Sequence, residues 1–371
     1  KARITLASAG YGGIEYLTDN YYSVGIGGVI VPPGTRSLGN YKPEITKTIE
    51  AGLDWRFFGN RLGFDFTYYR TNTTNQLITL AVPNASTFRN EYINAGLLRN
   101  SGVELMLNGT PLRSDKFSWD VMLNYSKNVN KVVRLTDELK TFILGDDRQV
   151  LQTVTEGGTY GEMYMASWRK DDQGRRLVSA TGVPLVLTTK TAYVGNYNPD
   201  YMLGVSNSFN FSNLSMSFLL DYRHGGTVVG GTQAAMDGNG TSKNSLMGRE
   251  GGIVLDAYTV AGVKNTASIS AETYFQAVGN RTPVGDLYAY SGTNLRLREV
   301  SLGYKIPTKL VSRSGFIQSA KLSLVGRNLV FFKRDAPFDP EIATAVSNRG
   351  GIEYASLPST RNFGLNLKLS F

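Results

Sequence analysis

The sequence contains no cysteine and a single histidine among its 371 residues. Without cysteine, the chain has no disulfide framework, no thiolate nucleophile and no cysteine-ligated metal. One histidine also argues against a Ser-His-Asp triad and against a metal site built from several histidines. The commonest side chains for metal binding and nucleophilic catalysis are therefore missing or scarce.

The sequence also lacks a long apolar run. No segment approaches the roughly 18 to 20 consecutive apolar residues that a membrane-spanning helix needs. Charged residues make up 19% of the chain, whereas glycine (41 residues), tyrosine (21) and phenylalanine (17) are abundant. A membrane-spanning β-strand needs only about 9 to 11 residues, of which half are apolar. A membrane protein built from strands therefore remains open.

Apolar and polar side chains alternate with a period of two along much of the chain, which is typical of β-strands with two different faces. In segment 45–57, for example, Leu53 and Trp55 alternate with Gly52 and Asp54. Nine segments follow this pattern and are predicted as strands: 45–57, 61–71, 97–109, 117–128, 203–211, 215–223, 293–306, 320–330 and 361–371. The segments 2–8 and 20–31 are predicted as further strands, and 150–195 has room for two more.

Two local signals refine this pattern. In the segment 294–307 the apolar positions change from odd to even numbers, which predicts a β-bulge near Arg298 and Glu299. One helix is predicted over 270–279, with Ser270 as its N-cap and Gly279 at its end.

The predicted connections alternate between short and long. The long ones cover 72–96, 129–202, 224–292 and 331–360, and the others are turns or shorter segments. Such alternation places every long connection at the same end of a sheet. Transmembrane barrels have this asymmetry, with short periplasmic turns and long extracellular loops.

Seven segments together resemble the C-terminal part of a SusC/RagA-family TonB-dependent outer-membrane transporter, over residues 43–371. They are FFGNRLGFDFTYYRTNTTNQLI (57–78), YINAGLLRNSGVELMLNGTPL (92–112), WDVMLNYSKNVNKVVRL (119–135), NLRLREVSLGYKIP (294–307), LVGRNLVFF (324–332), DAPFDPE (335–341) and LPSTRNFGLNLKLSF (357–371). The resemblance implies an all-β fold, an antiparallel transmembrane β-barrel of 22 strands. This chain would form its C-terminal portion. We expect the plug domain and the N-terminal barrel strands to lie outside residues 1–371.

The resemblance also implies a function. It indicates TonB-dependent uptake of oligosaccharides or oligopeptides across the outer membrane of a Gram-negative bacterium. The implied partners are a SusD-like surface lipoprotein that acts as a lid and the TonB–ExbB–ExbD complex that supplies energy. No enzymatic step and no cofactor are implied. Two alternatives stay open: a siderophore or cobalamin receptor with the same mechanism, and a soluble secreted carbohydrate-binding β-protein.

Candidate contact residues come from two polar and aromatic segments. Sugar rings are commonly held by aromatic faces together with fixed polar groups. The residues predicted to contact ligand or lid are Tyr160, Tyr164, Trp168, Arg169, Asp171, Asp172, Arg223 and His224. A strand pair with a solvated turn, followed by a mobile surface loop, is the structural alternative for the same segments.

The last strand is expected to carry an assembly signal. Its alternating apolar residues resemble the signal that the barrel assembly machinery reads in this family. They are Phe363, Leu365, Leu367, Leu369 and Phe371. Other aromatic residues near strand ends are predicted to form an interfacial girdle, namely Trp55, Phe57, Phe58, Tyr68, Tyr69, Trp119 and Tyr125.

The remaining signals are weaker. The net charge of +9 comes from scattered lysine and arginine, which argues against nucleic-acid binding. In a barrel these residues would line a polar lumen or contact outer-membrane lipid and lipopolysaccharide. The segment 237–241 has faint calcium-loop spacing without the closing glutamate, so no metal site is predicted. The acidic residues of 335–341 are expected to face solvent at the start of an extracellular loop.

Overall fold

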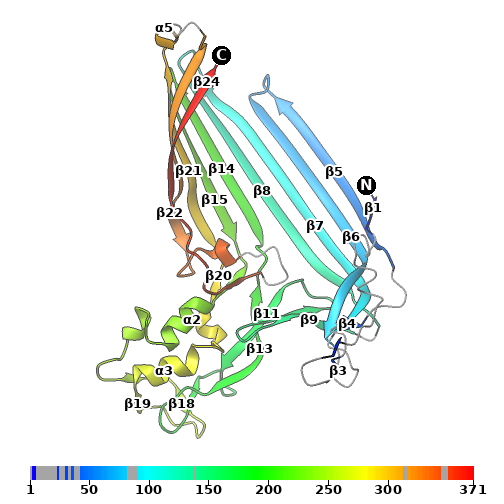
Figure 1. Ribbon diagram of the computed structural model, residues 1–371, viewed down its shortest axis with the longest axis vertical. Helices are drawn as coiled ribbons and strands as arrows, with labels where there is room; N and C mark the ends of the chain where they lie inside the picture. The colour runs from blue at the N-terminus through cyan, green and yellow to red at the C-terminus, as the bar shows by residue number, and fades with distance from the viewer. Residues whose placement is uncertain are drawn as a thin grey trace.

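The computed structural model describes residues 2–5, 23–24, 30–31, 35–36, 42–81, 90–137, 139–311, 316–343 and 350–371. A single sheet of 11 strands, almost entirely antiparallel, dominates these residues (Figure 1). We call this sheet the wall. Among the described residues, no helix has the length and apolar character to cross a membrane.

All nine predicted strands are confirmed as members of the wall. In spatial order the wall contains β1 (Ala2–Thr5), β5 (Glu44–Phe57), β6 (Leu62–Ala81), β7 (Asn90–Arg113), β8 (Phe117–Arg134), β14 (Tyr201–Phe211), β15 (Leu214–His224), β21 (Asn294–Ile306), β22 (Ser319–Arg334) and β24 (Asn362–Ser370), with β4 (Thr35–Arg36) beside β7. β1 lies within the predicted strand 2–8. In the segment 20–31 the described residues form β2 (Ser23–Val24) and β3 (Ile30–Val31), which pair with each other outside the wall.

The register of the wall separates an apolar face from a polar face. One row of paired apolar residues crosses five neighbouring strands, through Phe209, Met216, Leu302, Leu324 and Leu365. The side chains of Leu324 and Leu365 are 59% and 72% exposed. The polar face has its own rows one residue further along, such as Ser215, Gly303, Ser323 and Asn366. A surface of large apolar side chains this wide marks a face that normally contacts something other than water.

The predicted bulge in β21 is confirmed. Between Leu297 and Glu299 the pairing of β21 with β15 shifts by one residue, which leaves Arg298 as the extra residue. The pairing with β22 also shifts at this point, with the extra residue on β22. In a regular strand, the odd-numbered Leu297 and the even-numbered Leu302 would face opposite sides. The extra residue of the bulge places both on the apolar face.

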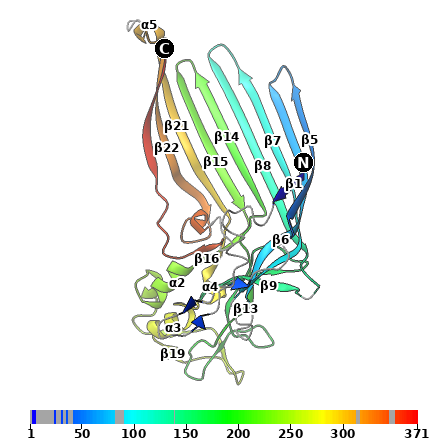
Figure 2. The ribbon, with the colours of Figure 1, turned by 45° about the vertical axis from the view of Figure 1, so that its right-hand side comes forward.

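The connections are short at one end of the wall and long at the other (Figures 1 and 2). At the short-turn end, the turn between β5 and β6 has left-handed backbone at Phe58, Gly59 and Asn60. The prediction of a long connection over 72–96 is wrong. β6 extends to Ala81 and β7 already begins at Asn90, so only residues 82–89 connect them. The other three long connections are confirmed at the opposite end.

The long connections fold into a compact assembly of small sheets and helices at the long-connection end (Figure 2). Its main elements are β9 (Thr141–Asp146), β10 (Leu151–Thr155), β11 (Glu162–Trp168), β13 (Val186–Asn196), β16 (Thr227–Gly230), α2 (Gly231–Gly238), α3 (Ala271–Val278), α4 (Gly285–Tyr288), β20 (Ala289–Ser291) and β23 (Ile352–Glu353). The helix predicted over 270–279 is confirmed as α3, and the Ser270 hydroxyl accepts a 3.1 Å hydrogen bond from Thr273 N. The segment 150–195 holds more strands than the two that the sequence suggested.

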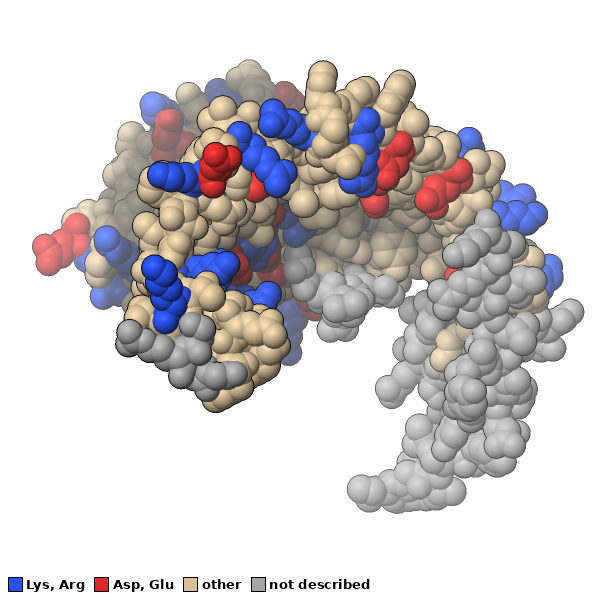
Figure 3. Space-filling view, turned by 90° about the horizontal axis from the view of Figure 1, so that it is seen from above, with Lys and Arg blue, Asp and Glu red and all other residues tan. Residues whose placement is uncertain are grey.

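The wall is an open arc rather than a closed ring. Seen from the short-turn end, the arc encloses a hollow, and lysine, arginine, aspartate and glutamate are interspersed along its rim (Figure 3). Among the described residues, β24 pairs with β22 on one side only. An antiparallel sheet with one apolar and one polar face has the architecture of part of a transmembrane β-barrel.

Candidate functional site

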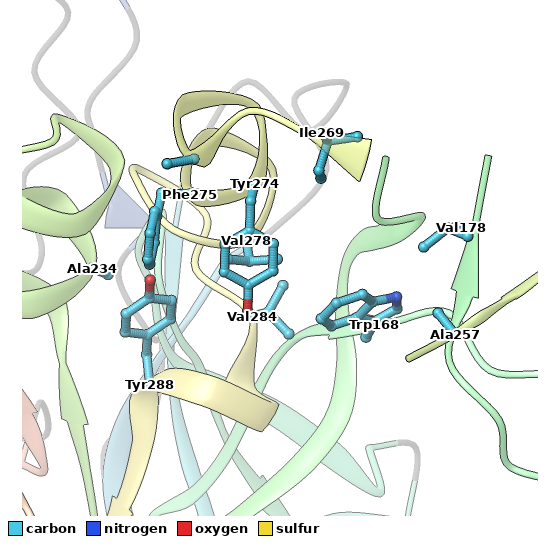
Figure 4. Packing of buried hydrophobic residues seen from close by; sticks show 11 residues of the cluster. Trp168, Val178, Ala234, Ala257, Ile269, Tyr274, Phe275, Val278, Val284 and Tyr288 are labelled. Atoms are coloured by element: carbon cyan, nitrogen blue, oxygen red, sulfur yellow. The ribbon is translucent and has the colours of Figure 1, made fainter. Parts of the chain in front are cut away.

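Trp168 lies in the packed interior of the long-connection assembly. Its side chain is 3% exposed, and its indole Nε1 donates a 2.8 Å hydrogen bond to the carbonyl oxygen of Leu177. Figure 4 shows the indole among buried residues that include Tyr274, with ring centroids 6.3 Å apart. The Arg176 guanidinium lies 4.8 Å from the Trp168 ring. In this structure the indole therefore packs the interior of the assembly.

Tyr160 and Tyr164 are only partly accessible. The Tyr164 hydroxyl donates a 3.3 Å hydrogen bond to Glu162 Oε2, and its ring meets Tyr193 edge-on at 5.5 Å. Burial raises the pKa of Tyr160 to about 12, because a buried phenolate is poorly solvated. Tyr193, which the sequence did not single out, is 57% exposed and offers more aromatic surface than either predicted tyrosine.

The charged residues after Trp168 form a turn. Asp171 Oδ1 accepts hydrogen bonds from the backbone N–H groups of Gln173 and Arg175, and Asp171 Oδ2 pairs with Arg175 Nε at 2.7 Å. Arg169 and Asp172 are exposed on either side of Asp171. This geometry matches the solvated turn that the sequence left open as the structural alternative.

A cavity of about 580 Å³ lies beside β11, β13 and α4. Its lining includes Trp168, Lys170, Leu187, Tyr193 and Asp286. Lys170 Nζ pairs with Asp286 Oδ1 at 2.9 Å. Burial alone would raise the pKa of Asp286, but hydrogen bonds from Lys170 and from the Trp168 backbone hold it below its ordinary value. The cavity combines an aromatic surface with fixed charges, and sequence reasoning missed it because its lining comes from distant segments.

Arg223 and His224 lie on opposite faces of the wall. His224 belongs to the apolar face, where it stacks on Tyr201 at 4.8 Å and shares a 3.0 Å hydrogen bond with Tyr222 Oη through Nδ1. Tyr125 joins the same group, 5.6 Å from Tyr201. Of these residues, Tyr125 belongs to the predicted girdle. Arg223 points to the polar face, and its Nη2 donates a 3.1 Å hydrogen bond to the carbonyl oxygen of Tyr197.

The predicted girdle is only partly an apolar-face feature. Trp119 stacks with Phe209 at 5.8 Å, and Trp55 stacks with Phe57 at 5.1 Å. Tyr69 departs from the prediction, because its hydroxyl donates a 3.1 Å hydrogen bond to Asn128 Oδ1 on the polar face.

The prediction that the acidic residues of 335–341 face solvent is wrong for Asp339 and Glu341. Asp339 is buried and pairs with Arg296 at 3.1 Å. Glu341 binds Arg298 through both carboxylate oxygens, at 2.9 and 3.1 Å. The phase break at Arg298 was the one sequence signal that could have located this ionic cluster.

No group of three or more histidine, aspartate or glutamate side chains with metal-site geometry occurs in the described part of the chain. Asp237, at the start of the segment with calcium-loop spacing, accepts hydrogen bonds from Gln233 Nε2 at 2.7 Å and Tyr288 Oη at 3.0 Å, and from Ser242 Oγ. Its carboxylate is thus occupied by protein donors.

The residues of the expected assembly signal all lie on β24 or at its end. Phe363, Leu365, Leu367, Leu369 and Phe371 are between 37% and 79% exposed. β24 offers these side chains on the apolar face, while its recognition by an assembly machinery stays a prediction.

A family model described as TonB dependent receptor-like, beta-barrel, matches residues 7–295. TonB-dependent receptor P3 of Formosa agariphila is 26% identical over 360 residues, which cover 90% of this chain and 34% of that protein. TonB-dependent receptor SusC of Bacteroides thetaiotaomicron is 21% identical over 345 residues, with 90% and 32% covered. The chain thus spans about a third of the length of these relatives.

A similar fold occurs in a solved structure. The RagAB peptide importer in its closed-closed state superposes with a TM-score of 0.67 at 21% identity, over 95% of this chain and 38% of that chain. This likeness concerns the fold.

Proposed function

The chain belongs to the TonB-dependent receptor-like β-barrel family, and from this premise we propose that it forms the C-terminal part of an importer for oligosaccharides or oligopeptides. Members of the family are outer-membrane transport proteins rather than enzymes. The two-faced wall carries the proposal, because its apolar face suits lipid and its polar face suits a lumen. The long-connection end is then extracellular.

Import needs energy and a moving barrier, and this wall supplies neither by itself. We infer that TonB, energised by ExbB and ExbD, acts on a plug domain inside the completed barrel. A SusD-like lipoprotein would cover the long-connection end as a lid. The chain's own share is then the lipid-facing wall, the extracellular assembly and the last barrel strand.

Ligand contact is best supported at the cavity beside β11 and α4. Tyr193 gives an exposed ring there, and the Lys170–Asp286 pair gives hydrogen-bonding groups of both signs. Among the predicted contact residues, Trp168 lines the cavity, and Tyr164 adjoins it through its ring contact with Tyr193. The exposed residues Arg169 and Asp172 follow the C-terminal end of β11, which ends at Trp168.

Lid contact is best supported by exposed apolar residues in the segment 246–263 of the assembly. Leu246, Met247, Val254, Val260 and Val263 are each more than half exposed, between 51% and 63%. Exposed apolar side chains mark a protein interaction surface where they form a contiguous patch. We expect Val260→Glu to weaken co-purification of a surface lipoprotein, while Val260→Ile, which keeps the apolar surface, leaves it intact. Equal recovery with both variants would contradict the lid assignment.

Growth tests the transport function. A strain without the gene should lose growth on one class of oligosaccharide or oligopeptide as sole nutrient, and loss of TonB should give the same defect. Tyr193→Ala should reduce uptake without reducing the amount of protein in the outer membrane. Normal growth on every oligosaccharide and oligopeptide tested, with loss of iron or cobalamin uptake instead, would favour the siderophore or cobalamin alternative.

A further inference from the structure

Three arginines meet on the polar face of the wall where β15 and β21 lie side by side. Arg296 and Asp221 are direct partners in the pairing of these strands, and Arg223 pairs with Asn294 two positions away. Arg298 is the bulged residue of β21. Its Nε donates a 2.9 Å hydrogen bond to Asp221 Oδ2. The wall thus gathers three guanidinium groups and one carboxylate.

The other two carboxylates come from a separate segment, Ala336–Ala343, which we call the strap. Arg296 and Asp339 form an ion pair of 3.1 Å whose side chains are only 3% and 4% exposed. Arg296 also contacts Glu341, and Glu341 binds Arg298 through both of its carboxylate oxygens. Both acidic residues of the strap therefore point at the arginines of the wall.

Packing holds the strap in this position. The Phe338 ring meets Tyr290 edge-on at 6.0 Å. Ala336 and Ala343 are 2% and 1% exposed and pack with Val228. The Glu341 backbone N–H donates a 3.0 Å hydrogen bond to Asp339 Oδ1, which orients the two carboxylates together.

The charges of the two parts cancel. Arg223, Arg296 and Arg298 with Asp221 give the wall a local charge of +2, and Asp339 with Glu341 give the strap −2. Arg223 Nε is buried without a hydrogen-bond partner in the described structure, so the wall retains donor capacity even with the strap in place. A buried guanidinium that loses its carboxylate is strongly unfavourable. A wall without the strap would therefore need another anion.

We propose that Arg223, Arg296 and Arg298 form a lumenal binding site for carboxylate groups of a ligand, which the strap occupies with its own carboxylates. Guanidinium groups match carboxylates in bidentate geometry, as Arg298 shows with Glu341. A ligand with two acidic groups competes with the strap and releases it. This site rests on the proposed function only in that a lumen must admit the ligand.

Thiol labelling measures release of the strap directly. Residues 1–371 contain no cysteine, so Ala336→Cys adds one buried reporter thiol to this chain, and protein without the substitution gives the background labelling. The protein is kept whole in outer-membrane preparations, and succinate serves as the probe. Succinate should raise the maleimide labelling rate at least about tenfold above sodium chloride of equal ionic strength, because it replaces both strap carboxylates. Equal rates in the two salts would overturn the proposal.

A charge-neutral strap gives the second test. With Asp339→Asn and Glu341→Gln together, labelling should be fast without succinate, and succinate should raise the thermal stability of this variant more than sodium chloride does. Glu299→Gln is the matched control, because Glu299 is also on β21 but pairs with Arg327 at 2.8 Å and does not contact the strap. If the strap variant labels as slowly as the control, the site does not hold the strap.

The two proposals fail in different ways. Labelling reports on the strap and needs no transport, so a normal succinate response with no nutrient uptake would refute the proposed function alone. Uptake of neutral ligands with no succinate response would refute the carboxylate site alone.

Discussion

At the scale of single residues, neighbouring positions on β24 have opposite environments. Leu365 belongs to the row of apolar side chains that crosses the wall, and Asn366 belongs to the polar row beside it. In a lipid-embedded wall, a charge is tolerated on one side of this strand and costly on the other. The contrast makes the face assignment testable with two adjacent substitutions.

Leu365→Lys should destabilise the folded barrel by about 2 kcal/mol or more, because a lysine on the lipid face must be buried in the bilayer. Asn366→Lys should change stability by less than about 0.5 kcal/mol, because it faces the lumen. Chemical denaturation of the barrel in lipid vesicles measures both. Equal effects of the two lysines would contradict the assignment of faces.

Tyr160 provides a titration that can be followed by absorbance. Its pKa of about 12 lies above the ordinary value of 10.0, because burial disfavours the phenolate. The folded state therefore binds the proton more tightly than the unfolded state. The resulting stability is fully present below about pH 10 and is lost as the pH rises toward about 12. The difference in phenolate absorbance between the native chain and Tyr160→Phe should titrate near pH 12, and a midpoint near 10 would refute the burial.

Residue roles in the long-connection assembly could not be derived from the sequence. Trp168 and Asp171 are close in sequence, which suggested one binding cluster, but Trp168 packs on Tyr274 and Asp171 caps its own turn. The position of Arg296 gave no sign that Asp339 would lie beside it. Contacts between segments far apart in the chain decide these roles, and no local pattern contains them.

At the scale of elements, strands with two contrasting faces were predictable and the others were not. The nine wall strands carry the alternation because one face needs apolar side chains. The end of β6 beyond residue 71 was missed because Asn72, Thr73 and Thr74 are polar on both faces. β9 to β13 were largely missed because glycines interrupt their pattern and because a small packed sheet needs no regular alternation.

The N-cap of α3 is an element-scale prediction. Ser270→Ala should destabilise the helix by about 1 kcal/mol, because Thr273 N loses its side-chain acceptor. Ser270→Asp should restore most of this, since aspartate caps equally well. Hydrogen exchange of the amides in Ala271–Val278 measures the difference. Equal protection in all three proteins would show that packing, rather than the cap, sets the stability of α3.

At the scale of the whole molecule, the lengths of the connections were enough to predict that all long connections lie at one end of the wall. The chain covers about a third of its curated relatives, and its wall is an arc with an unpaired edge at β24 among the described residues. Such an edge is not tolerated within lipid, so the arc requires further strands to close it. We therefore propose that the open arc is part of a larger barrel.

Cysteine scanning along β24 in outer-membrane preparations tests the membrane wall most directly, because the chain has no cysteine of its own. Single cysteines at positions 363, 365, 367 and 369 should react only with a lipid-soluble reagent. Cysteines at 362, 364, 366 and 368 should react with a water-soluble reagent that enters the lumen. Uniform reaction of all eight positions with the water-soluble reagent would contradict a lipid-facing wall.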